Sequence, residues 1–123
     1  MVEAKRKNLE EVSVWGTGSA SREFFFVEDA AKGIIEATKL YDESEPVNLG
    51  TNEEITIKQL VETLKELTGF SGAIKWDTLK PDGQPRRALD VSRAKEKFGF
   101  ESKTELQEGL RRTIKWYKAN VDE

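Results

Sequence analysis

The spacing of apolar residues along the chain predicts helices alternating with short strands. Helical periodicity is clearest near residues 29–41, 56–68, 92–98 and 104–119, and the charged residues 2–8 also read as helix. Short apolar runs predict strands at residues 12–15, 24–27, 47–49 and 73–77. This alternation is typical of an α/β fold with about four main helices and short strands.

The helix expected at residues 56–68 has the clearest boundaries. Thr56 and Gln59 have the spacing of a capping box, and Gly69 is the expected C-terminal stop. Thr104 and Gln107 repeat the capping-box spacing where the last helix is expected to begin. Both helices are therefore expected to start at a threonine.

Three phenylalanines and a valine at residues 24–27 read as a strand that is buried on both faces. No basic residue is interleaved with them, which disfavours a stacking platform for single-stranded nucleic acid. Glu28 and Asp29 follow, where carboxylates satisfy the free amide groups of a helix start. This capping role is favoured over a catalytic carboxylate pair.

Candidate binding chemistry gathers first at residues 14–29. Trp15 stands at the entrance of a loop bracketed by Gly16 and Gly18, and Arg22 stands at its exit. An aromatic face beside a guanidinium can stack a planar group while binding an anion. A dinucleotide fingerprint is rejected, because Ser21 holds the place of the third glycine and no helix follows. The alternative for Trp15 is a core aromatic.

A second stretch at residues 80–90 carries three cations, Lys80, Arg86 and Arg87, on a loop restrained by prolines. Guanidinium groups match the phosphates of a nucleotide diphosphate through paired donors. Arg22 and the arginine pair are therefore expected to converge on one anion site, with Arg87 slightly favoured because Pro85 restrains Arg86. The alternative is a basic turn that only aids solubility.

Composition excludes several classes of function. The 123 residues predict one domain over 1–123, and the absence of cysteine and histidine excludes a zinc site or a histidine base. A net charge of −3 with mixed signs disfavours nucleic acid as a partner. The sequence has neither an apolar run of membrane-spanning length nor a signal-peptide core, so a cytoplasmic location without membrane attachment is expected.

Both stretches resemble one family. The run Val-Trp-Gly-x-Gly-x-x-x-Arg-Glu-Phe at residues 14–24 and the run Lys-Pro-Asp-Gly-Gln-Pro-Arg-Arg at residues 80–87 resemble the extended short-chain dehydrogenase/reductases, NAD(P)-dependent sugar-nucleotide epimerases and dehydratases. The likeness is strongest to the GDP-L-fucose synthase subgroup. It implies the C-terminal substrate-binding region of that family. The residues implied to contact a nucleotide-diphosphate sugar are Trp15, Arg22, Asn48, Lys80, Arg86 and Arg87. For Asn48, an amide that satisfies a turn is an equal alternative.

The resemblance also implies what this chain lacks. The family's Rossmann half carries a glycine-rich cofactor turn and a Tyr-x-x-x-Lys pair, whereas Tyr41 and Tyr117 are followed four residues later by Glu45 and Val121. Relative to the family, the chain is expected to begin within a helix. NAD(P) is the cofactor of the complete family enzymes, and this chain alone is expected to bind no cofactor and to show no turnover. The alternative is a structural or interaction module without ligand binding.

The expected partner surface follows from the same resemblance. In the family, the helix after the phenylalanine run and the strand at residues 47–49 lean on the Rossmann half. Ile34 and Ile35 would then be exposed here, and exposed apolar surface favours burial against a partner. The missing half or a second copy in a homodimer would cover them. Local repacking of a monomer is the alternative.

Overall fold

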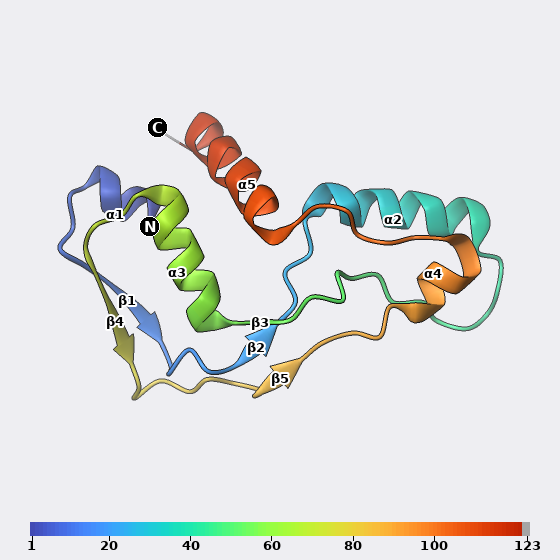
Figure 1. Cartoon of the computed structure of the whole chain (residues 1–123), viewed down its shortest axis with the longest axis horizontal. Helices are drawn as coiled ribbons and strands as arrows, with labels where there is room; N and C mark the ends of the chain where they lie inside the picture. Colours follow the sequence, from blue (N-terminus) through green and yellow to red (C-terminus); the bar gives the residue numbers. More distant parts are fainter. Residues whose placement is uncertain (122–123) are drawn as a thin grey trace.

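The computed structural model describes residues 1–121, which form five helices and five short strands (Figure 1). In chain order these are α1 (Val2–Arg6), β1 (Glu11–Trp15), β2 (Ser21–Arg22), α2 (Val27–Leu40), β3 (Ile55–Thr56), α3 (Ile57–Thr68), β4 (Ala73–Asp77), β5 (Arg86–Arg87), α4 (Ser92–Phe98) and α5 (Leu106–Asn120). The α/β class is confirmed, as are the four main helices, each within two residues of its expected ends.

The five strands form two separate small sheets. β1 and β4 pair in parallel over their full length, from Glu11 beside Ala73 to Trp15 beside Asp77. Figure 1 shows them at one end of an elongated molecule, together with α1 and α3. The second sheet has the order β3-β2-β5, with β2 antiparallel to β3 and parallel to β5. It lies midway along the molecule, so the loops leaving β1 and β4 run into it.

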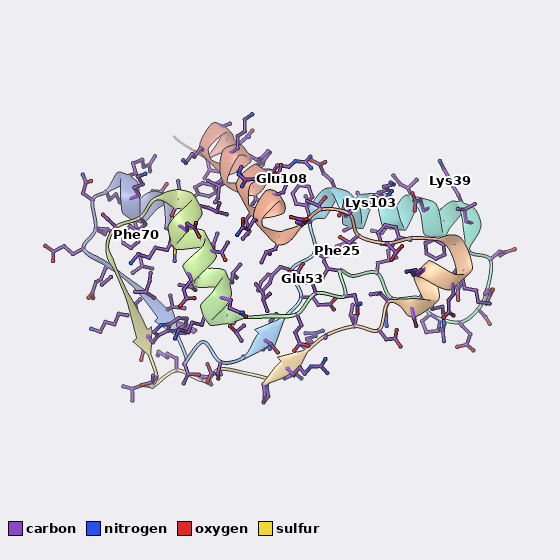
Figure 2. The ribbon with its side chains drawn as sticks, viewed as in Figure 1. Phe25, Lys39, Glu53, Phe70, Lys103 and Glu108 are labelled. Carbon is purple, nitrogen blue, oxygen red and sulfur yellow. The ribbon has the colours of Figure 1, made fainter. Side chains whose placement is uncertain are left out.

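Two apolar clusters hold the ends of the molecule. Near α1 and α3, the buried side chains are Ala4, Val61 and Phe70. Towards α2 and α4, the ring of Phe100 packs on Phe25 with centroids 6.3 Å apart. Figure 2 places Phe70 and Phe25 in different halves of the structure. The core is therefore two small clusters rather than one.

The strands expected at residues 24–27 and 47–49 are wrong, because neither segment pairs with a sheet. The phenylalanines pack against other segments instead: Phe25 meets Phe100, which follows α4, and Phe26 lies against Gly109 of α5. Val27 already belongs to α2 and is 70% exposed, so the run is not buried on both faces. An apolar run of this length satisfies helix packing as well as strand pairing, which periodicity alone does not separate.

Of the two capping boxes predicted from the sequence, one forms and the other does not. At α3, the Thr56 hydroxyl accepts from the Gln59 backbone and the Gln59 side chain accepts from the Thr56 backbone, which confirms the capping box. The box expected at Thr104 is wrong, because α5 has Glu105 as its N-cap without a side-chain cap. The backbone N–H of Thr104 donates instead to Asp29 Oδ2 over 2.8 Å.

Asp29 thus serves a different helix from the one expected. α2 has no side-chain cap, and the Asp29 carboxylate accepts from the Ser102 hydroxyl and from the backbone N–H groups of Lys103 and Thr104. Partial burial raises the pKa of Asp29, but these hydrogen bonds outweigh it and leave the pKa below its ordinary value. The carboxylate ties the start of α2 to the segment before α5 and is structural.

The outer face of α2 is apolar and open to water. Ile34 is 60% exposed and Ile35 is 53% exposed, as expected from the sequence. The opposite face packs through Gly33, where an added Cβ would lie 2.8 Å from the Phe100 ring. Among residues 1–121, no helix has the length and apolar character needed to cross a membrane.

Candidate functional site

The two stretches that carry candidate chemistry lie side by side, joined by Asp82 and Thr17. Asp82 Oδ1 accepts the Thr17 backbone N–H, and Asp82 Oδ2 accepts the Thr17 hydroxyl, each over 2.7 Å. Gly16 makes this approach possible: its φ is +83°, and an added Cβ would lie 2.3 Å from Asp82 Oδ1. The loop after β1 and the loop after β4 therefore form one unit.

Trp15 and Lys80 meet on these loops. Trp15 is the last residue of β1 and is 69% exposed, which excludes the core alternative. The Lys80 ammonium lies 5.4 Å from the centroid of the Trp15 ring, within the range of a cation–π contact. An exposed aromatic face with a cation beside it is suited to a planar anionic ligand.

Arg22 extends the same surface towards the second sheet. Its guanidinium Nη2 lies 3.7 Å from the Cβ position of Gly83, one residue beyond Asp82. Ser21 next to it donates its backbone N–H to the Pro85 carbonyl over 2.9 Å. Arg22 Nη1 donates to the Ser21 carbonyl over 2.6 Å, which is the one hydrogen bond that the guanidinium makes within the described part of the chain.

The register of the second sheet separates the two neighbouring arginines. Arg22 is the register partner of Arg87, and Ser21 is the partner of Arg86. Register partners on neighbouring strands share a face, and consecutive residues alternate between faces. Arg22 and Arg87 therefore lie on one face, with Arg86 on the other.

Glu54 occupies the face that holds Arg86. Arg86 Nε donates to both Glu54 oxygens, over 2.9 and 2.8 Å, and the Ser21 hydroxyl donates to the same carboxylate. The Arg86 hydrogen bond is the largest cause that lowers the pKa of Glu54. The side chain of Arg87 is exposed and makes no hydrogen bond or ion pair within residues 1–121. Arg86 thus has a carboxylate partner, and Arg87 keeps its donors for solvent or a ligand.

Asn48 is not brought to this surface by its hydrogen bond. Its amide Nδ2 donates to the Asp90 carbonyl over 3.1 Å, which ties the segment before β3 to the segment after β5. Asp90 is distant in sequence, so this hydrogen bond links two segments and is not the turn-satisfying role that the sequence offered as an alternative. Of the six candidate residues, the structure pairs Trp15 with Lys80 and places Arg22 beside Arg87.

Glu23 was not singled out by the sequence, yet its carboxylate joins three segments. Its Oε1 accepts the backbone N–H groups of Thr51 and Asn52 over 3.2 and 2.8 Å, and its Oε2 accepts that of Leu89 over 2.7 Å. The available signal was an acidic residue directly after Arg22 in the Arg-Glu-Phe run. A lone carboxylate in a short apolar stretch has many possible roles, so the pattern did not reveal this one.

The loop surface holds no metal-binding arrangement. Within the described residues, no group of three or more histidine, cysteine, aspartate or glutamate side chains could hold a metal ion. Asp82, the carboxylate on the joined loops, has both oxygens engaged by Thr17. The Thr17 hydroxyl, followed by its backbone N–H, holds the pKa of Asp82 below the ordinary value of 3.8. The surface is suited to binding an anion rather than a cation.

Comparison with known proteins shows which families the chain resembles. Residues 1–50 match the NAD dependent epimerase/dehydratase family. The chain is 49% identical over 119 residues to a probable GDP-L-fucose synthase 1 of Oryza sativa subsp. japonica, covering 97% of this chain and 36% of that protein. It is 36% identical over 129 residues to a GDP-L-fucose synthase of Escherichia coli (strain K12), covering 98% of this chain and 40% of that protein.

Solved structures show the same correspondence in three dimensions. A GDP-L-fucose synthetase from Naegleria fowleri superposes with a TM-score of 0.89 at 25% identity, covering 98% of this chain and 37% of that one. A UDP-glucose 4-epimerase from Thermotoga maritima, solved with UDP-glucose, gives 0.85 at 30% identity, covering 98% and 38%. The chain thus resembles the NAD dependent epimerase/dehydratases among the extended short-chain dehydrogenase/reductases, and it matches the C-terminal part of GDP-L-fucose synthase structures. It spans little more than a third of the length of these relatives.

Proposed function

We propose that this chain binds the nucleotide-diphosphate part of a sugar nucleotide, as the substrate-binding portion of an NAD(P)-dependent epimerase or reductase related to GDP-L-fucose synthase. The observation that carries this proposal is that Trp15 lies against Lys80 and Arg22 is the register partner of Arg87, while Asp82 and Thr17 join the loops that lead from β1 and β4 to these arginines. Trp15 offers its exposed ring to the base. Arg22 and Arg87 share one sheet face and offer paired donors to the diphosphate.

The relatives support this assignment. Their names describe GDP-L-fucose synthases, and one neighbouring structure is described with UDP-glucose. Another structure of the Naegleria fowleri enzyme is described as bound to NADP. We infer that NAD(P) serves the complete enzymes and that this chain, by itself one domain, supplies the contacts to the substrate.

Turnover requires groups that this sequence does not contain. Neither Tyr41 nor Tyr117 is followed four residues later by lysine, so no tyrosine has the lysine partner that the family's proton-transfer step uses. We therefore propose that the chain alone does not reduce or epimerise a sugar nucleotide when supplied with NADH or NADPH. The alternative function is a structural or interaction module that keeps the fold without binding a ligand.

Calorimetric titration of the chain with GDP, UDP and ADP separates these functions, with orthophosphate as the control for general anion binding. Saturable binding of GDP or UDP that exceeds binding of orthophosphate supports the proposed site. Comparing GDP with GMP measures how much the second phosphate contributes to binding. We expect this contribution to be large, because both Arg22 and Arg87 are proposed to bind the diphosphate. Equal, weak responses to all of these anions would favour the structural module.

The apolar face of α2 supports a further part of the proposal, an association through Val27, Ile34 and Ile35. Val27 and Ile34 lie seven residues apart, so they share one side of the helix. Trp116 of α5 is also 61% exposed and lines a cavity of about 400 Å³ together with Val27. We propose that a second copy of the chain, or the remaining part of a complete enzyme, covers this surface.

A further inference from the structure

We propose that Glu23 is a positioning residue that aligns Arg22 with Arg87 for the nucleotide diphosphate. This inference rests on the proposed function and adds to it a residue that does not touch the ligand. Glu23 directly follows β2, the central strand of the second sheet. Its carboxylate reaches the chain before β3 and the chain after β5, so it binds all three strands of that sheet to one another.

The sheet itself is too small to fix the arginines. Each of its strands has two residues, and only Ser21 and Arg22 pair with β5. Strands of this length have few ladder hydrogen bonds, and an isolated pair of strands is only marginally stable in water. Arg22 and Arg87 nevertheless have to hold one spacing to bind two phosphates together, since paired donors are effective only in a fixed geometry.

The Glu23 carboxylate supplies the missing hydrogen bonds. It accepts from the backbone N–H groups of Thr51, Asn52 and Leu89, and hydrogen bonds from N–H to a charged carboxylate are roughly twice as strong as neutral ones. Leu89 lies two residues beyond Arg87, so the bond to its N–H fixes β5 just past the arginine. We call this set of three hydrogen bonds the Glu23 bridge.

The loop opposite is shaped to receive the carboxylate. An added Cβ at Gly50 would lie 3.1 Å from Glu23 Oε1 and 3.1 Å from Val91 Cγ1, so a glycine leaves the necessary room. Asn52 adopts a φ of +58°, a left-handed conformation that is unfavourable for most residues, while its N–H donates to Glu23. The loop conformation and the carboxylate position are therefore matched to each other.

A charge effect and a positioning effect of Glu23 predict opposite changes in the Kd for GDP, which makes the inference testable. Glu23→Gln removes a negative charge next to an anion site, so simple electrostatics predicts tighter GDP binding. The amide also replaces one acceptor by a donor that faces a backbone N–H, so the Glu23 bridge opens and the arginines lose their alignment. We therefore expect Glu23→Gln to raise the Kd for GDP by about fivefold or more, the size of the loss of a single ordinary hydrogen bond.

The matched control is Glu53→Gln, because Glu53 is exposed and the same charge is removed (Figure 2). Its Kd should stay within about twofold of the unsubstituted chain. Glu23→Asp keeps the charge but shortens the reach, and it too should weaken GDP binding. Hydrogen exchange at the amides of Thr51, Asn52 and Leu89 should become faster in both Glu23 variants. This measurement tests whether the Glu23 bridge is lost, and it requires no ligand.

A double-mutant cycle separates positioning from general stability. If Glu23 acts by aligning the arginines, Glu23→Gln should add little to the Kd of Arg87→Ala, whereas a purely structural role would raise the Kd equally in both backgrounds. Tighter or unchanged GDP binding by Glu23→Gln, or an equal effect in both backgrounds, overturns the inference while the binding site stands. Absence of GDP binding by the unsubstituted chain would instead overturn the proposed function, and the positioning role with it.

Discussion

Arg22 and Arg87 are register partners on the parallel strands β2 and β5, although they lie far apart in the sequence. Arg86 stands beside Arg87 in sequence but lies on the opposite face, where Glu54 pairs with it over 2.8 Å. One step along a strand thus separates the arginine proposed to bind phosphate from the one that pairs with a carboxylate of the chain. The contrast between two adjacent arginines gives the proposed site its sharpest test.

Arg22→Ala and Arg87→Ala should each raise the Kd for GDP by about tenfold or more. Each loses a charge-assisted hydrogen bond to phosphate, which contributes about 1.5–3 kcal/mol. Arg86→Ala removes the same side chain from the other face and should change the Kd by less than about threefold. Titration calorimetry gives all three values. A larger loss from Arg86→Ala than from Arg87→Ala would contradict the assignment of faces.

Trp15→Ala should weaken GDP binding by about fivefold or more, because base stacking on an aromatic ring is worth roughly 1–3 kcal/mol. Trp15→Phe keeps a smaller ring and should retain part of the affinity. Trp15 is 69% exposed, so neither change should lower stability appreciably. Ligand binding measured by fluorescence, with thermal unfolding as the control, separates the two effects. Unchanged affinity for GDP in Trp15→Ala would contradict the proposal that the base stacks on Trp15.

How much of this site the sequence predicts depends on the range of the interactions. The Gly-x-Gly loop and the Pro-Asp-Gly loop are local signals, and both stretches were recognised from them. Which strand faces the arginines occupy is set by register with distant strands, so the sequence left Arg86 and Arg87 undivided with only a slight preference. Their separation came from the partner of Arg86, Glu54, in a segment that carried no local signal.

The same limit explains the expected strand at residues 24–27. Its apolar character agrees with the structure, but whether these phenylalanines form a strand or pack against other segments depends on Phe100 and Gly109, far along the chain. The capping box at Thr56 involves residues three apart and was predicted in full. Thr104 has equivalent local spacing, but the long-range carboxylate of Asp29 binds its backbone N–H instead.

The Asp82 hydrogen bonds to Thr17 should make the two loops sensitive to acid. The pKa of Asp82 is lowered in the folded chain, so its contribution is fully present above the ordinary aspartate value of 3.8 and is lost as pH falls through the lower folded pKa. The amide proton of Thr17 should therefore shift with a midpoint below 3.8 in an NMR titration. Asp82→Asn should abolish this shift. A midpoint above the ordinary value would mean that Thr17 does not hold the carboxylate.

The exposed face of α2 predicts reversible self-association of this chain. Val27, Ile34 and Ile35 are each more than half exposed, and burying apolar surface contributes about 25 cal/mol per Å². Sedimentation from low to high micromolar concentration should show a rising average mass. A symmetric dimer pairs the same face of both copies, so one substitution acts twice in the interface.

Ile34→Lys should therefore restore the mass of a single chain at all concentrations, because it places two like charges in a buried apolar contact. Leu79→Lys is the matched control: Leu79 is 94% exposed, but it lies in the loop after β4 rather than on α2. Its variant should associate like the unsubstituted chain. If the unsubstituted chain sediments as a monomer at every concentration, the α2 face does not drive self-association. If Ile34→Lys and Leu79→Lys lose association equally, the contact does not depend specifically on α2.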